Sequence, residues 1–260
     1  MISNSTIEIL MNRKSIRKYQ DKEPRDEIIE TIVKAGQQAP FAYQLGSMLL
    51  SRNRDENPCN APLFFIICVD SHRHEEVMAR RGWKMVQNDL SLLLFGIQDA
   101  SYMAENMVIA GESLGMGSCF LGGIPYQAEK IIEQYNLPSR VFPLVGLVMG
   151  YPAENPPVRP RYPLNISLMD TQYNLAGDEL MENAMEVMDQ GYLDQDYYRS
   201  LNAMIPLANG REESYTFDNY SWTEHISRKT GQWMESPDQL LEQFAKCGFY
   251  IPGYNQKSDE

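Results

Sequence analysis

Residues 89–124 read DLSLLLFGIQDASYMAENMVIAGESLGMGSCFLGGI. Apolar side chains recur at helical spacing over residues 90–114, and the carboxylates among them are frequent enough to exclude a membrane-spanning helix. Two glycines within residues 115–117 end this helix, and residues 118–121 follow as a short strand that closes on a second pair of glycines. We therefore expect a long central helix that leads directly into a strand.

Helical and strand patterns alternate on either side of this stretch. The predicted helices are 5–12, 26–37 and 128–135, and the predicted strands are 48–51, 63–69 and 141–151. The strand at 63–69 is continuously apolar, which is typical of burial on both faces.

The C-terminal third of the chain has a helical pattern throughout. The first predicted helix covers 178–189, and the second begins at Ser221. The third runs from Ser236-Pro237 to a stop at Gly248. Capping boxes mark the helix starts at Ser5-x-x-Glu8 and Ser221-x-x-Glu224.

Charge is distributed unevenly along the 260 residues, whose net charge is −12. Residues 166–260 contain 17 acidic and 6 basic residues, whereas residues 1–165 are close to neutral. We expect a core over 1–165 and an acidic, mainly helical extension over 166–260 that belongs to the same domain. The acidic balance disfavours binding to nucleic acid or to an anionic membrane.

The cysteines indicate a reducing compartment. The four of them are widely spaced without a CxxC pair, and no signal-peptide pattern opens the chain. The longest uninterrupted apolar run, 63–69, is far too short to span a bilayer. These features predict a cytoplasmic protein with no membrane partner.

Several familiar catalytic patterns are missing from the sequence. There is no P-loop and no zinc-ligand spacing, and Gly115-x-Gly117 follows a helix and precedes a strand, the reverse of the dinucleotide-binding motif. His72 and His74 lack a third metal ligand, so we interpret them as part of a solvated loop. His225 lies in the first turn of a helix, where packing or surface roles outweigh catalysis. A Ser/His or Cys/His hydrolase and a metal site are therefore disfavoured.

Two clusters of positive charge stand out against this background. They comprise Arg13, Lys14, Arg17 and Lys18, and Arg159 and Arg161. Alternate side chains of an extended backbone point the same way, so Arg13, Ser15 and Arg17 share a face, as do Arg159 and Arg161. Guanidinium groups bind phosphate oxygens bidentately, so the clusters suit a phosphate group. Spacing alone leaves open that they are surface charges paired with the acidic extension.

Four segments of the chain together resemble the FMN-dependent nitroreductase superfamily, and in particular its oxygen-insensitive, NADPH-preferring (NfsA/Frp-type) branch. RKSIRKY at 13–19 is similar to the R-R-S-x-R-x-F signature, and residues 100–124 resemble the central helix and its Gly-Gly strand end. VGLVMGYPAENPPVRPRYP at 145–163 and SWTEHI at 221–226 resemble two further motifs. The likeness covers about residues 5–230 in the same order.

This resemblance implies an α+β fold with a central mixed sheet flanked by helices, assembled as an intertwined homodimer with helical C-terminal arms. One FMN would lie in each of two clefts at the subunit interface. The residues expected to bind it are Arg13, Lys14, Ser15, Arg17, Gln44, Asn60, Leu121, Gly122, Gly123, Arg159 and Arg161. The arginine clusters would hold the phosphate and ribityl chain, Asn60 the pyrimidine edge, and the glycines would let the flat ring approach the backbone.

One segment departs from the family pattern, at residues 39–48. Gln44 stands where the family has Asn, Gly46 where it has Gln, and Phe41 where it has Ser or Thr. Gln44 can keep the amide contact, but Gly46 cannot supply the second one. We therefore expect a wider or more apolar substrate face.

The resemblance implies a flavin oxidoreductase in which NAD(P)H, with NADPH favoured, reduces FMN. A small acceptor, such as a nitroaromatic, a quinone or free flavin, then takes two electrons in a ping-pong cycle. No catalytic side chain is required, because the flavin carries the chemistry. Arg211 is a candidate for the 2′-phosphate of NADPH, or else it pairs with nearby acids. The alternatives are a specialised reductase, a dehalogenase or an enone reductase on the same fold, or a non-catalytic FMN sensor or store.

Overall fold

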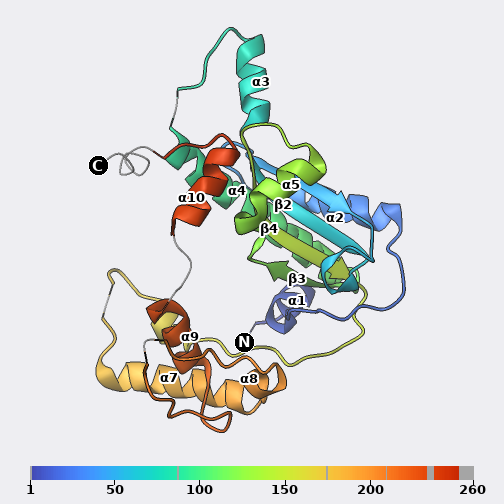
Figure 1. The fold of residues 1–260 in the computed structure, drawn as a ribbon. Helices are drawn as coiled ribbons and strands as arrows, with labels where there is room; N and C mark the ends of the chain where they lie inside the picture. Colours follow the sequence, from blue (N-terminus) through green and yellow to red (C-terminus); the bar gives the residue numbers. More distant parts are fainter. Residues whose placement is uncertain (1, 87, 174, 209, 233–236, 252–260) are drawn as a thin grey trace, which may run out of the picture. The chain divides into compact units, whose positions relative to one another are not determined.

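The chain folds into two compact units in the computed structural model (Figure 1). The structure describes residues 2–86, 88–173, 175–208, 210–232 and 237–251. The first unit comprises residues 1–156 and 236–260, and the second comprises residues 157–235. Within the described part of the chain, no helix has the length and apolar character needed to cross a bilayer. The division at residue 165 stays a prediction.

A four-stranded sheet forms the centre of the first unit. Its strands are β1 (Gly46–Ser51), β2 (Leu63–Asp70), β3 (Gly117–Leu121) and β4 (Val141–Gly150), in the order β1-β2-β4-β3. All three neighbouring pairs are antiparallel, where the resemblance implied a mixed sheet. Parallel pairing is present outside the strands, in an isolated bridge between Ser15 and Ser118, where the Ile16 N–H donates to the Ser118 carbonyl at 2.8 Å.

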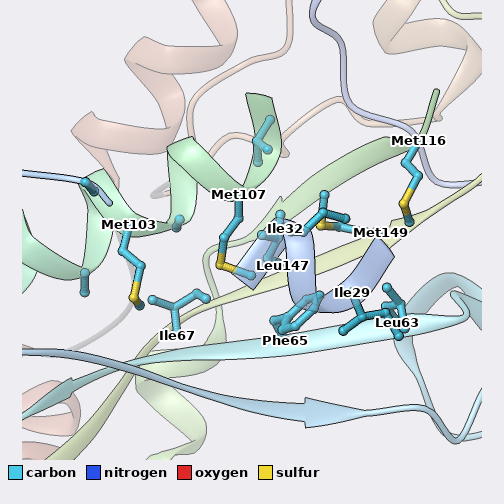
Figure 2. Packing of buried hydrophobic residues seen from close by; sticks show 14 residues of the cluster. Ile29, Ile32, Leu63, Phe65, Ile67, Met103, Met107, Met116, Leu147 and Met149 are labelled. Atoms are coloured by element: carbon cyan, nitrogen blue, oxygen red, sulfur yellow. The ribbon is translucent and has the colours of Figure 1, made fainter. Parts of the chain in front are cut away.

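Two helices, α2 (Asp26–Gln37) and α4 (Asp89–Ser113), pack on one face of the sheet. Figure 2 shows Met103 and Met107 of α4 directed towards Ile67 and Phe65 of β2. The helices approach closely because α2 carries Gly36, where an added Cβ would lie 2.6 Å from Met107 Cγ. The methionines fill the irregular space between helix and sheet.

The other face of the sheet is covered by the short helical turn η2 (Ile124–Gln127) and by α5 (Ala128–Tyr135). Alternate residues of β2, Phe64, Ile66 and Cys68, pack there. All eight residues of β2 are buried, which confirms the expected two-sided strand. Helix α10 (Pro237–Lys246) packs against α5 and η2, so the end of the chain belongs to the first unit.

Several helices differ from the sequence expectation. Helix α1 (Ser5–Asn12) is capped by Asn4, whose side chain accepts the Ile7 N–H at 3.0 Å. The cap is therefore the residue before Ser5, the first residue of the proposed capping box. His72 and His74 begin helix α3 (His72–Arg80) rather than a loop. The remaining short elements are η1 (Pro58–Asn60), α6 (Leu164–Ser167) and α8 (Tyr197–Ser200).

Helix α9 (Trp222–Gly231) in the second unit is capped by a neighbouring helix instead of by its own capping box. Asp189, on α7 (Asp178–Leu193), accepts the Thr223 N–H at 2.8 Å and also the Thr223 hydroxyl. Ser221 Oγ donates to the Asp189 carbonyl at 2.7 Å, so it is not available to the helix N-terminus. The proposed cap of α10, Ser236, lies outside the described residues.

Candidate active site

The first positively charged segment runs beside β3 and alternates its side chains between two environments. Ile16 is buried against Gly117, where an added Cβ would lie 2.5 Å from Ile16 Cγ1. Lys14 lies on the same side as Ile16, and its Nζ donates to Asn155 Oδ1 at 2.5 Å. Both residues line a cavity of about 460 Å³ between α1, the end of α4 and the segment that follows β4.

Arg13 and Arg17 occupy the alternate positions of this segment. The Arg13 guanidinium lies 6.0 Å from the centre of the Phe120 ring, and Arg17 is exposed. The N–H groups of Arg17 and Lys18 donate to Glu154 Oε1 at 2.5 and 3.1 Å. Glu154 thus holds the backbone of the segment in place, a role that the sequence did not indicate.

The Gly122-Gly123 pair follows β3 and lies at the surface. A Cβ added to either residue would meet no other atom within 4 Å, and neither residue has a left-handed φ. Neither packing nor backbone conformation therefore requires glycine at these positions. A remaining physical reason for glycine here is that a flat molecule can approach the bare backbone closely. A flavin ring is a flat molecule of this kind.

Asn60 lies in an unusual turn shortly before the start of β2. Both Cys59, with φ of 59°, and Asn60, with φ of 48°, adopt the left-handed conformation, which is costly for residues other than glycine. Asn57 stabilises the turn, because its side-chain amide donates to the carbonyls of Ser51 and Ala61 at 3.3 and 2.9 Å. Asn60 is exposed and free to meet a ligand.

Gln44 lies in a loop between α2 and β1 that borders a second cavity, of about 250 Å³. The residue is exposed and has a left-handed φ of 57°. A buried carboxylate on α4, Asp99, accepts backbone N–H groups of this loop. From the sequence, Asp99 is interpreted only as one of the carboxylates that interrupt the long apolar helix, although its spacing places it on the same helical face as Ala100 and Met103. At Gly46 an added Cβ would lie 3.1 Å from Met103 Cε, so packing restricts this position.

The second arginine cluster belongs to the second unit and makes contacts within it. Arg159 Nη1 donates to Gln195 Oε1 at 2.6 Å, and its guanidinium lies 3.9 Å from the centre of the Tyr197 ring. Arg161 is exposed and donates to the carbonyls of Arg159 and Pro160 at 3.0 and 2.9 Å. Arg161 therefore has the freer side chain for an incoming anion.

Arg211 and Arg228 differ sharply in their availability. Arg211 is exposed, whereas Arg228 is buried. Arg228 contacts Glu213 Oε2 at 2.6 Å and Glu224 Oε1 at 2.7 Å, and its hydrogen bonds lower the pKa of Glu213 to about 2. Because two carboxylates already neutralise Arg228, Arg211 is the better candidate for a nucleotide phosphate.

The histidines have no arrangement typical of catalysis. His225 Nδ1 lies 3.0 Å from the Tyr220 hydroxyl and its ring stacks on Tyr198, while burial lowers the pKa of the imidazole. These contacts agree with a packing role. Over the described ranges, no group of three or more metal-ligating side chains is assembled.

The fold is that of a nitroreductase-type protein, and sequence comparison agrees. The Nitroreductase family matches residues 10–50 and 45–151. The chain belongs to this family.

Individual relatives extend the likeness over most of the chain. The chain is 30% identical over 239 residues to an FMN reductase (NADPH) of Bacillus subtilis, covering 86% of this chain and 90% of that protein. It is 28% identical to an oxygen-insensitive NADPH nitroreductase of Salmonella typhimurium, covering 94% and 98% of the two chains.

Solved structures show the same fold. The NfrA2 structure from B. megaterium superposes with a TM-score of 0.78 at 26% identity, covering 96% of this chain and 99% of that one. The NADPH:FMN oxidoreductase of Vibrio harveyi, solved with NAD+, gives a TM-score of 0.74 at 26% identity, covering 94% and 98%.

Proposed function

We propose that the protein is an FMN-dependent oxidoreductase that passes two electrons from NAD(P)H, with NADPH favoured, to nitroaromatics, quinones or free flavin. The single observation that carries this proposal is the open Gly122-Gly123 pair, for which neither packing nor φ requires glycine. The reductase activities named for the relatives support it and do not favour a dehalogenase or a non-catalytic sensor.

When bound, FMN supplies the ability to accept a hydride from nicotinamide and to release two electrons to a second substrate. The residues of this chain bind and orient it. Arg13, Ser15 and Arg17 are suited to the phosphate and ribityl chain, and Gly122 and Gly123 to the ring. The cations near the site also favour the extra negative charge that reduction brings.

An anaerobic reduction experiment tests the proposed function. We expect the purified protein to show oxidised-flavin absorption bands that NADPH bleaches faster than NADH. Replacing Arg211 with alanine should raise the KM for NADPH about tenfold and leave that for NADH unchanged, because one charge-assisted phosphate contact is lost. The control is Arg25→Ala, which removes an exposed arginine of the first unit and should change neither constant.

The outcomes separate the proposal from its alternatives. A yellow protein that neither nucleotide bleaches would favour the sensor, and a colourless protein that cannot be reconstituted with FMN would exclude the proposal.

We also propose that the protein is a homodimer, intertwined through its C-terminal arms, with a second copy on the apolar face of α4. Leu90 and Leu94, four residues apart on α4, are 60% and 57% exposed, and Ile97 continues the same face. Apolar surface arranged in this way is typical of protein interfaces. The two FMN clefts would lie at that interface.

Sedimentation equilibrium tests the dimer. We expect twice the chain mass of 29.8 kDa for the wild type and the monomer mass for Leu94→Asp. Val77→Asp, at a comparably exposed apolar position on α3, should stay dimeric. A monomeric wild type would contradict the proposal.

A cytoplasmic location is a further proposal, supported by the four free cysteines.

A further inference from the structure

Asp99 is a buried carboxylate whose two oxygens both bind backbone N–H groups of one loop. Oδ1 accepts the Ala42 N–H at 2.7 Å, and Oδ2 accepts the N–H groups of Tyr43 and Leu45 at 3.1 and 3.0 Å. The residue is 3% exposed. A charge this deeply buried is tolerated only where hydrogen bonds satisfy it, so the loop and the carboxylate depend on each other.

The loop is held from the inside and presents its side chains outward. Ala39 and Leu45 are buried at its two ends, while Phe41 and Tyr43 are 57% and 53% exposed. The Tyr43 ring packs edge-on against Phe95 of α4, with 5.3 Å between the ring centres. Gln44, next to it, is exposed in a left-handed conformation that the bound N–H groups on either side help to maintain.

The outward side chains suit a planar aromatic molecule. Phe41 offers an aromatic ring, and Gln44 offers an amide that can donate and accept hydrogen bonds. The same loop lines the cavity of about 250 Å³ that includes Phe41, Gln44 and Asp99.

We infer that Asp99 is a positioning residue that holds the 41–45 loop in the shape needed to bind planar aromatic electron acceptors. This inference rests on the proposed function, because it requires that Gln44 lies at the site. A neutral amide cannot replace the carboxylate. Asparagine has one acceptor oxygen for three N–H donors, and its own NH2 group would face at least one of them.

Asp99→Asn tests the inference, with Asp89→Asn as the matched control. Asp89 is equally buried on the same helix and also accepts a backbone N–H, but its partners are Tyr250 N–H at 2.7 Å and Arg140 Nη1 at 2.8 Å instead of the loop. Both variants should lose stability. The readouts are amide hydrogen exchange of the loop without cofactor, and kcat and KM with 2-methyl-1,4-naphthoquinone as acceptor.

In Asp99→Asn we expect exchange at Ala42, Tyr43 and Leu45 to accelerate at least about tenfold. The quinone KM should rise about tenfold while kcat stays within about twofold, because binding geometry is lost and the flavin chemistry is not. In Asp89→Asn the loop exchange and the KM should match the wild type.

Equal losses of stability in both variants, with loop exchange and KM unchanged, would overturn the inference. If the wild type binds no FMN, the proposed function fails, and so does the acceptor role, whereas the exchange measurement still decides whether Asp99 holds the loop. Should Asp99→Asn not fold, Asp99→Glu replaces it. Both oxygens are then kept but displaced, and an unchanged KM would count against the inference.

Discussion

Replacing Arg140 with leucine is expected to lower the free energy of unfolding by about 3–5 kcal/mol, because it leaves a buried carboxylate without its partner. Arg140 Nη1 lies 2.8 Å from Asp89 Oδ1, and both side chains are almost fully buried. The same nitrogen donates to the Gly248 carbonyl at 2.8 Å, and the guanidinium lies 4.5 Å from the centre of the Phe249 ring. Arg140 therefore joins the start of α4 to the residues that follow α10.

Thermal unfolding with Arg25→Leu as control measures this effect. Arg25 pairs with Glu27 at 3.4 Å, but both side chains are largely exposed, so its loss should cost less than about 0.5 kcal/mol. At about 2–4 °C per kcal/mol, the Arg140 variant should melt roughly 10 °C lower. Combining it with Asp89→Leu should recover part of the loss, since the uncompensated charge is removed. A single-variant loss below about 1 kcal/mol would show that the pair is not structurally important.

Replacing Gly122 with valine is expected to weaken FMN binding at least about 100-fold while leaving the cofactor-free protein almost unchanged in stability. A Cβ added at Gly122 would meet no protein atom within 4 Å other than its chain neighbours, and the backbone there is not left-handed. A surface change of this kind should move the melting temperature of the cofactor-free protein by less than about 2 °C. In the complex, the same methyl groups would occupy the space of the ring.

Gly115→Ala is the matched control for this variant. A Cβ added at Gly115 would also meet no atom within 4 Å, but the φ of 79° is left-handed, so alanine there should cost about 1 kcal/mol of stability and leave the FMN dissociation constant unchanged. Titration of flavin fluorescence gives the affinities, and calorimetry gives the stabilities. If Gly122→Val bound FMN with the wild-type dissociation constant, Gly122 would not be part of the FMN site.

Most helix positions in the first unit, α3 excepted, could be predicted from local pattern. The apolar periodicity over 26–37 and the following Pro40 predict α2 with its observed bounds, and residues 128–135 predict α5 in the same way. Both signals depend on neighbours within four residues along the chain, which a sequence displays directly. Strand β2 could be predicted in the same way, because its residues are continuously apolar.

Interactions between distant segments could not be predicted in this way. The capping box at Ser221 is a correct local pattern, yet Asp189, more than thirty residues earlier, supplies the cap. His72 and His74 suggested a loop because they lie in a charged stretch directly after a strand, whereas in the structure they begin α3.

The sequence by itself determined the family, the positions of most helices and strands, and the cationic segments that could meet a phosphate, because each depends on residue type and short-range spacing. Only the tertiary structure decided which of those groups are available. Arg228 is neutralised by two carboxylates, and Lys14 is hydrogen-bonded to Asn155. The space beside Gly122, in contrast, is not filled by other side chains. Availability depends on burial and on partners far away along the chain, which only the folded backbone brings within hydrogen-bonding distance.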